Sequence, residues 1–317
     1  MEKIRVATAN RGAGTAPVFA AVEGGYFKDE QLEVELIPHE GHQRSLRALL
    51  AGEAEFTNAV AAELVRANVT HGGDAVIIAS AISRSAQQVS ARPGLSRRED
   101  LRGKRWGVQA RGDADECSIV MAFDRWGWDL ANDAEIVVVG TDGPRLDLLL
   151  DPARVDVAIM HAPEPFQAAR RGWALVEDLG RLDVAWQNSC AATTRRLISS
   201  RPDLALRYAR AYCRGVYRFR TDAAFGQEVL RRYTGESDPA FIEATYVLFA
   251  RLMGAMMFPS LEGVRAAAAM LHRLGVIDRL PAPEDVVDLG PVARLEAEGL
   301  FRRLLGVTGV GCEARTP

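Results

Sequence analysis

Short strand patterns alternate with helix patterns along the first part of the chain, and this alternation limits the possible folds more than any other sequence feature. The strand patterns are apolar and rich in β-branched residues, and they span residues 4–8, 32–38, 56–58, 75–82, 106–109, 135–139, 155–160 and 175–178. Helix patterns separate most of them. Such an order is typical of strands that pair in parallel through right-handed crossovers. We therefore predict an α/β protein in which helices flank mostly parallel sheet.

The alternation restarts once, which predicts two lobes rather than one continuous sheet. With 317 residues, the chain is long enough for two medium-sized domains. From Pro202 onward the sequence is almost entirely helical, and these helices need an apolar surface to cover. We predict that residues 1–82 begin lobe I, that residues 83–187 form lobe II, and that residues 188–317 return to lobe I as a mostly helical segment.

Charge and composition argue against several partners. Lys and Arg total 39 against 42 Asp and Glu, so a net charge of −3 offers no basic excess for a nucleic-acid backbone. The longest apolar stretches are interrupted well before the roughly 20 residues that a membrane span needs. The five histidines and four cysteines do not fall at metal-ligand spacings. We expect no nucleic-acid partner, no membrane span, no metal and no cofactor.

The start of the chain leaves two cellular locations open. Met1 leads directly into the first strand pattern, without the apolar segment and cleavage site of a secretory signal. We expect a cytoplasmic protein if Met1 is the native start, and a periplasmic or other extracytoplasmic protein if a leader was removed. The scattered cysteines are expected to be ordinary reduced thiols.

Four segments, in consistent order, resemble a known family. They read APVFAAVEGGYFKDEQLEVEL at 16–36, LRALLAGEAEFTNA at 46–59, DLRGKRWGVQARGDADE at 100–116 and RVDVAIMHAPEPFQAARRGW at 154–173. Together they resemble the NMT1/THI5-like group of the type II periplasmic-binding-protein fold, which includes binders of sulfonates, nitrate and taurine.

The resemblance implies a two-lobed clamp. Each lobe would be a mostly parallel sheet flanked by helices, with the helical C-terminal segment packed on the first lobe. Two chain crossings, near residues 81–85 and 184–190, would act as a hinge. A small-molecule ligand would lie in the cleft between the lobes. The general preference of ligands for the strand ends of α/β sheets favours the same place.

In lobe I, we expect ligand-binding residues in the loops that follow the strands. The candidates are polar or basic and comprise Asn10, Arg11, Thr15, His42, Thr57 and Asn58. Glycines beside Arg11 let backbone N–H groups approach a ligand, although a flexible turn explains them equally well. His42 begins a helix, so it is either a capping or surface residue or a ligand contact.

In lobe II, the candidates again follow strand patterns, except for Trp186, which lies at the second chain crossing. They comprise Gln109, Arg111, Asp113, His161, Glu164 and Trp186. Asp113 and Glu116 have capping-box spacing, which is a structural alternative to ligand binding. Glu164 belongs to the Glu-Pro turn of the family, and His161 stands where the family usually has a small or polar residue. Trp186 either stacks on a planar ligand or packs in a core.

Carboxylates gather at the start of one helix of lobe II. Asp113, Asp115 and Glu116 would repel a simple oxyanion there and occupy the positive end of the helix. Arg111 offsets part of this charge. We therefore expect the ligand to be a zwitterion, a cation or an aromatic heterocycle rather than a simple oxyanion.

Three functions fit such a clamp. The first, which we favour, is the solute-binding component of an ABC importer, with the transporter permease as partner. The second is a cytosolic enzyme with decarboxylase, desulfinase or lyase-like chemistry on a small aromatic or carboxylic acid, using His42 and His161 as acid and base. Related desulfinases carry a cysteine just after the first strand, where this chain has Arg11-Gly12-Ala13, so desulfination is not assigned. The third is a cytosolic ligand sensor.

Overall fold

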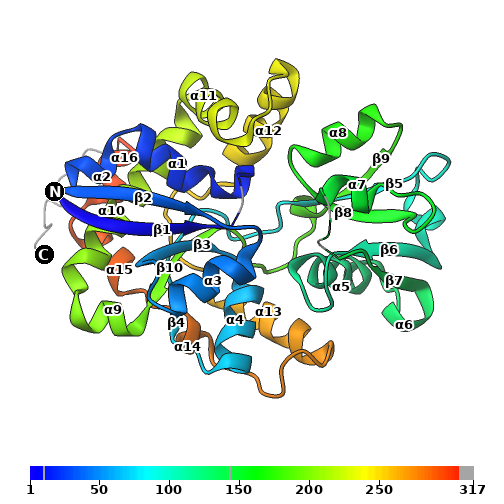
Figure 1. The fold of residues 1–317 in the computed structure, drawn as a ribbon, viewed down its shortest axis with the longest axis horizontal. Coiled ribbons are helices and arrows are strands. Elements are labelled where there is room, and N and C mark those ends of the chain that lie inside the picture. The colour runs from blue at the N-terminus through cyan, green and yellow to red at the C-terminus, as the bar shows by residue number, and fades with distance from the viewer. Residues whose placement is uncertain (10, 141, 143, 307–317) are drawn as a thin grey trace, which may run out of the picture.

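Two five-stranded sheets, one in each lobe, form the framework of the protein (Figure 1). The computed structural model describes residues 1–9, 11–140, 142 and 144–306. The sheet of lobe I has the order β2-β1-β3-β10-β4, with β1 at Glu2–Thr8, β2 at Leu32–Pro38, β3 at Phe56–Ala59, β4 at Ala75–Ser80 and β10 at Cys190–Thr194. The sheet of lobe II has the order β7-β6-β8-β5-β9, with β5 at Gln87–Ala91, β6 at Lys104–Val108, β7 at Ala134–Val138, β8 at Val157–His161 and β9 at Ala174–Asp178. The predicted two-lobed α/β fold is confirmed.

Both sheets are mixed. β1 pairs in parallel with β2 and β3, and β6 pairs in parallel with β7 and β8. β10 is antiparallel to β3 and β4, and β5 is antiparallel to β8 and β9. Each sheet therefore contains one antiparallel strand, and these two strands are the ones that the sequence patterns do not predict.

Helices cover both faces of each sheet (Figure 1). Those of the first part of lobe I are η1 (Ala13–Thr15), α1 (Ala16–Glu23), α2 (Tyr26–Asp29), α3 (His42–Leu50) and α4 (Ala61–His71). Those of lobe II are η2 (Arg98–Leu101), α5 (Ala114–Trp126), α6 (Leu130–Asp133), α7 (Arg145–Leu149), α8 (Glu164–Arg170) and η3 (Leu179–Arg181). Within the described residues, none of the helices combines the length and the apolar character that a bilayer crossing requires.

The C-terminal helices pack on lobe I, as predicted. They are α9 (Arg195–Ser200), α10 (Pro202–Thr221), α11 (Ala223–Thr234), α12 (Pro239–Leu252), α13 (Leu261–Arg273), α14 (Pro283–Val286), α15 (Gly290–Ala297) and α16 (Leu300–Leu304). α10 lies so close to α1 that a Cβ added at Gly215 would sit 2.6 Å from the backbone nitrogen of Ala21. The rings of Phe56 in β3 and Tyr208 in α10 stack with centroids 3.8 Å apart. The sheet and the C-terminal helices therefore share one core.

The chain passes between the two sheets twice. It leaves lobe I between Ser80 and Gln87, and it returns between Asp178 and Cys190. The two segments hydrogen-bond to each other, with Asn188 N donating to Ile82 O at 3.0 Å. The lobe boundaries that we propose, after residues 82 and 187, lie in these segments.

The lobes also touch on two sides of the crossings. In the α8–α12 contact, Arg170 pairs with Asp238 and lies 4.0 Å from the ring centroid of Phe241. In the α5–α13 contact, apolar side chains of α5 share a buried cluster with residues of α4 and α13. There, Val276 lies so close to Gly112 that a Cβ added at that glycine would sit 2.3 Å from a methyl carbon of the valine.

Candidate functional site

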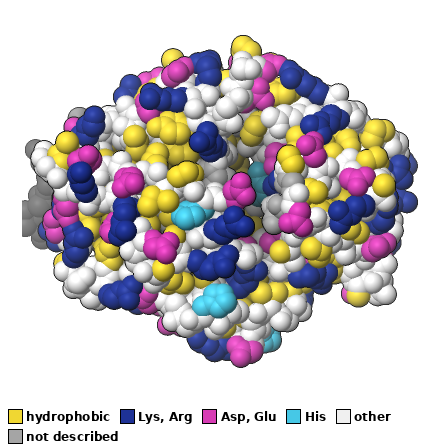
Figure 2. Space-filling model, in the orientation of Figure 1, with side chains coloured by type: hydrophobic (Ala, Val, Ile, Leu, Met, Phe, Trp, Pro, Cys, Tyr) yellow, Lys and Arg dark blue, Asp and Glu magenta, His cyan; other side chains and the backbone are white. Residues whose placement is uncertain are grey.

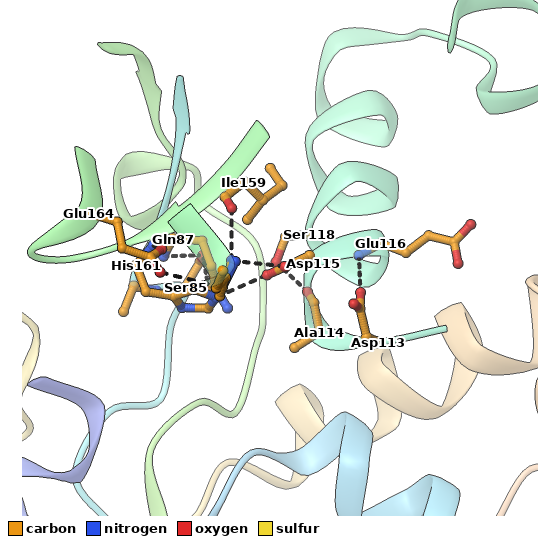
Figure 3. A network of polar contacts seen from close by, with 12 residues as sticks. Ser85, Gln87, Asp113, Ala114, Asp115, Glu116, Ser118, Ile159, His161 and Glu164 are labelled. Atoms are coloured by element: carbon orange, nitrogen blue, oxygen red, sulfur yellow. Dashed lines mark hydrogen bonds and ion pairs between the residues drawn. The ribbon is translucent and has the colours of Figure 1, made fainter. Parts of the chain in front are cut away.

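A buried carboxylate and a half-exposed imidazole lie together on the wall of lobe II. His161 Nε2 is 2.9 Å from Asp115 Oδ1. Figure 3 shows the two side chains pointing toward each other, one from α5 and the other from the end of β8. The side chain of Asp115 is 5% exposed, whereas that of His161 is 41% exposed. The buried carboxylate of Asp115 therefore holds the ring of His161 in place, and part of that ring remains exposed to solvent.

Arg145 holds the other oxygen of the same carboxylate. Its Nη2 donates to Asp115 Oδ2 at 2.9 Å and to the backbone oxygen of Ile159 at 3.0 Å. Its Nε lies 3.5 Å from Glu164 Oε1. Burial raises the pKa of Asp115, but Arg145 and His161 outweigh it, so that the pKa lies below the ordinary value. Asp115 is therefore a carboxylate at neutral pH.

The turn after β8 fixes the backbone of His161. Glu164 is the first residue of α8, and its Oε2 accepts a hydrogen bond from His161 N at 3.0 Å. The peptide bond between Ala162 and Pro163 is cis. β8 ends at His161 and α8 begins at Glu164, so the tight turn between them places both residues at the carboxyl end of this strand.

The start of α5 is capped as its sequence predicts. Asp113 is the N-cap residue, and its Oδ1 accepts from Glu116 N at 2.9 Å. Glu116 Oε2 in turn accepts from Gly112 N, and its Oε1 lies 2.9 Å from Arg111 Nη2. These bonds hold the first turn of α5, from which Asp115 reaches His161.

His42 lies on the lobe I side, at the first position of α3. Burial and the nearby charge of His161 lower the pKa of His42 to about 4, while the backbone carbonyl of Asn58 and the carboxylate of Asp115 act in the opposite direction. His42 is therefore uncharged at neutral pH. The structure brings the two predicted histidines, one from each lobe, within electrostatic range of each other.

The surroundings of the two histidines are rich in carboxyl groups. Burial and the charge of Asp115 raise the pKa of Asp113 to about 8. Burial raises the pKa of Glu63 in α4, and Arg66 only partly offsets this effect. Figure 2 shows the surface hollowed where the lobes meet, with charged side chains of both signs and histidine near the hollow. Burial is the main cause of both raised pKa values, so these two carboxyl groups hold a proton more readily than exposed ones do.

The other predicted site residues differ in position. Arg11 and Arg111 are exposed and Gln109 is half-buried, whereas Asn10 lies outside the described residues. Thr15, Thr57 and Asn58 are buried, at 0%, 0% and 2% exposure.

Four predicted ligand contacts, those of Thr15, Thr57, Asn58 and Trp186, need correction because their side chains are buried. Thr57 Oγ1 donates to Ala7 O at 2.9 Å, so it serves the interior of the sheet. Trp186 is 0% exposed and packs in the cluster shared by α4, α5 and α13. Of the two alternatives for Trp186, the structure supports the core.

Sequence reasoning missed the partners that give His161 its setting. The sequence predicts only a repelling charge at Asp115, and it predicts no role for Arg145. A weak signal exists for Arg145, which begins α7 shortly after the end of β7, where polar residues often face a ligand. The Asp115–Arg145 pairing joins residues 30 positions apart, and no local pattern predicts it.

Within the part of the chain that the structure describes, the thiols and metal-ligand side chains offer no alternative centre. Burial raises the pKa of Cys117 and Cys190, so neither thiol is a ready nucleophile. Among the described residues, no group of three or more His, Cys, Asp or Glu side chains is arranged to hold a metal ion.

The low pKa of His42 predicts a measurable loss of stability in acid. In the unfolded chain this imidazole binds a proton near its ordinary pKa of 6.5, but in the folded protein only near 4. Between these values the unfolded state binds more protons, so stability falls as the pH falls. At pH 4.5 this contribution amounts to about 2.5 kcal/mol.

Urea unfolding at pH 7 and pH 4.5 tests this expectation with His42→Gln. The variant should lose less stability between the two pH values than the wild type does. The exposed His71, at the end of α4, supplies the control variant His71→Gln. An identical acid loss in wild type and His42→Gln would contradict the assignment.

Comparisons with known proteins agree with this architecture. The sequence matches the NMT1/THI5-like family over residues 13–221. No curated protein sequence matches the chain.

Solved structures of low sequence identity share the fold. A putative sulfonate ABC transporter periplasmic sulfonate-binding protein, SsuA, from Methylobacillus flagellatus KT is 16% identical, with a TM-score of 0.75 over 100% of this chain and 99% of that one. The alkanesulfonate-binding protein SsuA from Xanthomonas axonopodis pv. citri, bound to MOPS, is 14% identical, with a TM-score of 0.73 over 92% and 99%. The desulfurization enzyme DszB is 13% identical, with a TM-score of 0.64 over 94% and 100%. Since the family match covers more than half of the chain, the protein belongs to the NMT1/THI5-like family.

Proposed function

We propose that the protein binds a small organic solute between its lobes and serves as the solute-binding component of an ABC importer. The observation that carries this proposal is the half-exposed ring of His161, fixed by Asp115 and within electrostatic range of His42 on the other lobe. A solute between the lobes would contact both walls at once, which is how hinged binding proteins hold their ligands. The similarity to sulfonate-binding proteins of importers supports the role.

The charge around His161 argues for a solute with a positive or hydrogen-bond-donating group. Asp115 bonds the ring and Glu164 bonds the backbone nitrogen of His161, and the guanidinium of Arg145 pairs with both carboxylates. One guanidinium shared by two carboxylates leaves little positive charge near the ring for an anionic ligand. We propose a zwitterion, a cation or an aromatic heterocycle as ligand, in preference to a simple oxyanion. Exposed Arg11 and half-buried Gln109 are proposed as further contacts.

Matched probes of opposite charge test the ligand class. Benzamidine and benzenesulfonate each carry one charged group on a phenyl ring, so a thermal-shift and calorimetric titration with both compares the two signs of charge on the same aromatic ring. A ligand at 100 times its Kd should stabilise the protein by about 2.7 kcal/mol. We expect benzamidine to bind better than benzenesulfonate, and the reverse order would contradict the proposed ligand class while leaving solute binding intact.

His161→Ala tests the binding site itself. The variant should lower the affinity for whichever solute binds by about 5- to 30-fold, because a hydrogen-bonding contact is worth about 1–2 kcal/mol. His71→Ala should bind like the wild type. If a wider screen of amines, amino acids, heterocycles and sulfonates yields no binding that depends on His161, solute binding at this site is refuted.

Cell fractionation in the native organism tests the importer role. A solute-binding component should be found in the osmotic-shock fluid of the periplasm or its extracytoplasmic equivalent. A chain confined to the cytosol would contradict delivery to an importer without affecting the binding result.

A further inference from the structure

The contacts of His161 resemble those of a general base more than those of a simple binding residue. Binding requires only an accessible polar group, whereas a general base also requires a fixed orientation and one fixed tautomer. The structure supplies both through Asp115 and its neighbours.

The tautomer follows from the partner of each nitrogen. Asp115 is ionised, because Arg145 holds its other oxygen at 2.9 Å and its pKa lies below the ordinary value. A carboxylate only accepts, so His161 Nε2 must donate to Asp115 Oδ1 across the 2.9 Å between them. In the neutral ring, the proton is on Nε2, and Nδ1 therefore carries the lone pair.

The ring is held directly by Asp115, and further contacts hold the backbone of His161 and the carboxylate of Asp115. The backbone nitrogen of His161 donates to Glu164 Oε2, and Arg145 bridges Glu164 and Asp115 while donating to the backbone of β8 at Ile159. Only the ring itself remains open, with 41% of the side chain exposed. A surface histidine that merely pairs with a carboxylate does not need this second layer of contacts.

The opposite wall contributes an imidazole that stays neutral. His42 lies on lobe I, is desolvated, and carries no charge at neutral pH. Because His42 is neutral, it does not compete with a positively charged substrate for the carboxylate of Asp115. The two walls together offer one base with a lone pair and one neutral ring.

We propose that His161, positioned by Asp115, is a general base that removes a carbon-bound proton from a small molecule held between the lobes, an activity beyond solute binding. The proton moves to Nδ1, and the electron pair of the C–H bond moves into a neighbouring π bond or expels a leaving group. The imidazolium formed is stabilised by the Asp115 carboxylate, and it returns its proton to the product or to water. The net reaction is a proton shift or an elimination, so it needs no oxidant, reductant or second substrate.

Elimination of 5-nitrobenzisoxazole tests this chemistry with a planar heterocycle. A base removes the proton at C3, the C–H electron pair forms the nitrile, and the N–O bond breaks to give a coloured cyanophenolate. Wild-type protein should accelerate this reaction beyond the same concentration of free imidazole. His161→Gln should reduce kcat/KM by at least 100-fold, within the range known for general bases.

Two further variants separate chemistry from structure. His71→Gln should retain the wild-type rate. Asp115→Asn should lower kcat by at least 10-fold with little change in KM, because an amide no longer enforces the tautomer with its lone pair on Nδ1. Where Asp115→Asn does not fold, as judged by circular dichroism, His161→Gln decides the question.

The outcomes are unambiguous. Loss of the reaction in folded His161→Gln, with retention in His71→Gln, supports the proposal. A wild type no faster than free imidazole, or a His161→Gln variant as fast as the wild type, overturns it. Neither of these results affects the solute-binding titrations, so the two proposals fail independently.

Discussion

Asp115→Ala should lower the free energy of unfolding by about 3–5 kcal/mol, because it leaves the guanidinium of Arg145 buried without its principal partner. The side chain of Arg145 is 19% exposed, and its closest carboxylate contact is Asp115 Oδ2 at 2.9 Å. The remaining carboxylate, that of Glu164, lies at 3.5 Å from Nε and compensates only in part. Urea unfolding followed by circular dichroism measures the loss.

An exposed ion pair provides the matched control. Asp147 pairs with Arg171 at 2.6 Å, with side-chain exposures of 55% and 51%. Asp147→Ala should change the free energy of unfolding by no more than about 1 kcal/mol, as is usual for surface pairs. Equal losses in the two variants would show that burial of Arg145 does not govern the stability of this site.

A double variant tests whether the unpaired charge of Arg145 causes the loss of stability. Asp115→Leu combined with Arg145→Met removes both charges together, so no buried ion is left unpaired. The double variant should be clearly more stable than Asp115→Ala alone. If it is less stable, the loss arises from packing rather than from the unpaired guanidinium.

Gly263→Ala is expected to destabilise the protein by about 3 kcal/mol, because no space exists for the added methyl group. A Cβ at this position of α13 would lie 2.3 Å from the backbone carbon and oxygen of Trp186. Helix propensity alone predicts the opposite, a gain of about 1 kcal/mol for alanine over glycine. The sign of the change therefore distinguishes the two effects. Thermal and urea unfolding provide the measurement.

The position of Gly263 connects this loss to binding. Trp186 belongs to the segment that returns the chain to lobe I, and Gln187 Oε1 next to it accepts from Ser260 N, the N-cap of α13, at 2.8 Å. A displaced α13 should therefore also weaken solute affinity. Gly254→Ala is the control, since a Cβ there would meet its nearest atom at 3.7 Å. A stable Gly263→Ala variant would show that α13 moves freely over this segment.

The sequence patterns predicted the regular part of the fold because those elements have a local signature. β2 spans Leu32–Pro38, as its alternating apolar residues predict. β5 and β10 lack that signature. β5 buries Gln87, Gln88 and Ser90, and polar residues in a strand are recognised as interior only when their partners are known.

In the candidate site, too, the sequence predicted the residues that have a local signature. Polar residues at strand ends pointed to His42 and His161, because strand ends in α/β sheets converge on one edge. The orientation of single side chains was not predictable. Thr57 follows the same pattern, yet it bonds within the sheet. The role of Asp115 depends on Arg145 and His161, which only the folded chain brings to it.

Both contacts between the lobes include an exposed ion pair, but only one of them adds a buried apolar cluster. Arg170–Asp238 joins α8 to α12 and Arg273–Asp124 joins α5 to α13, so added salt should loosen both contacts. The buried apolar cluster of the α5–α13 contact should also weaken on cooling. Ionic strength would thus act on both contacts, and temperature mainly on the α5–α13 contact, in setting how long a captured molecule is retained.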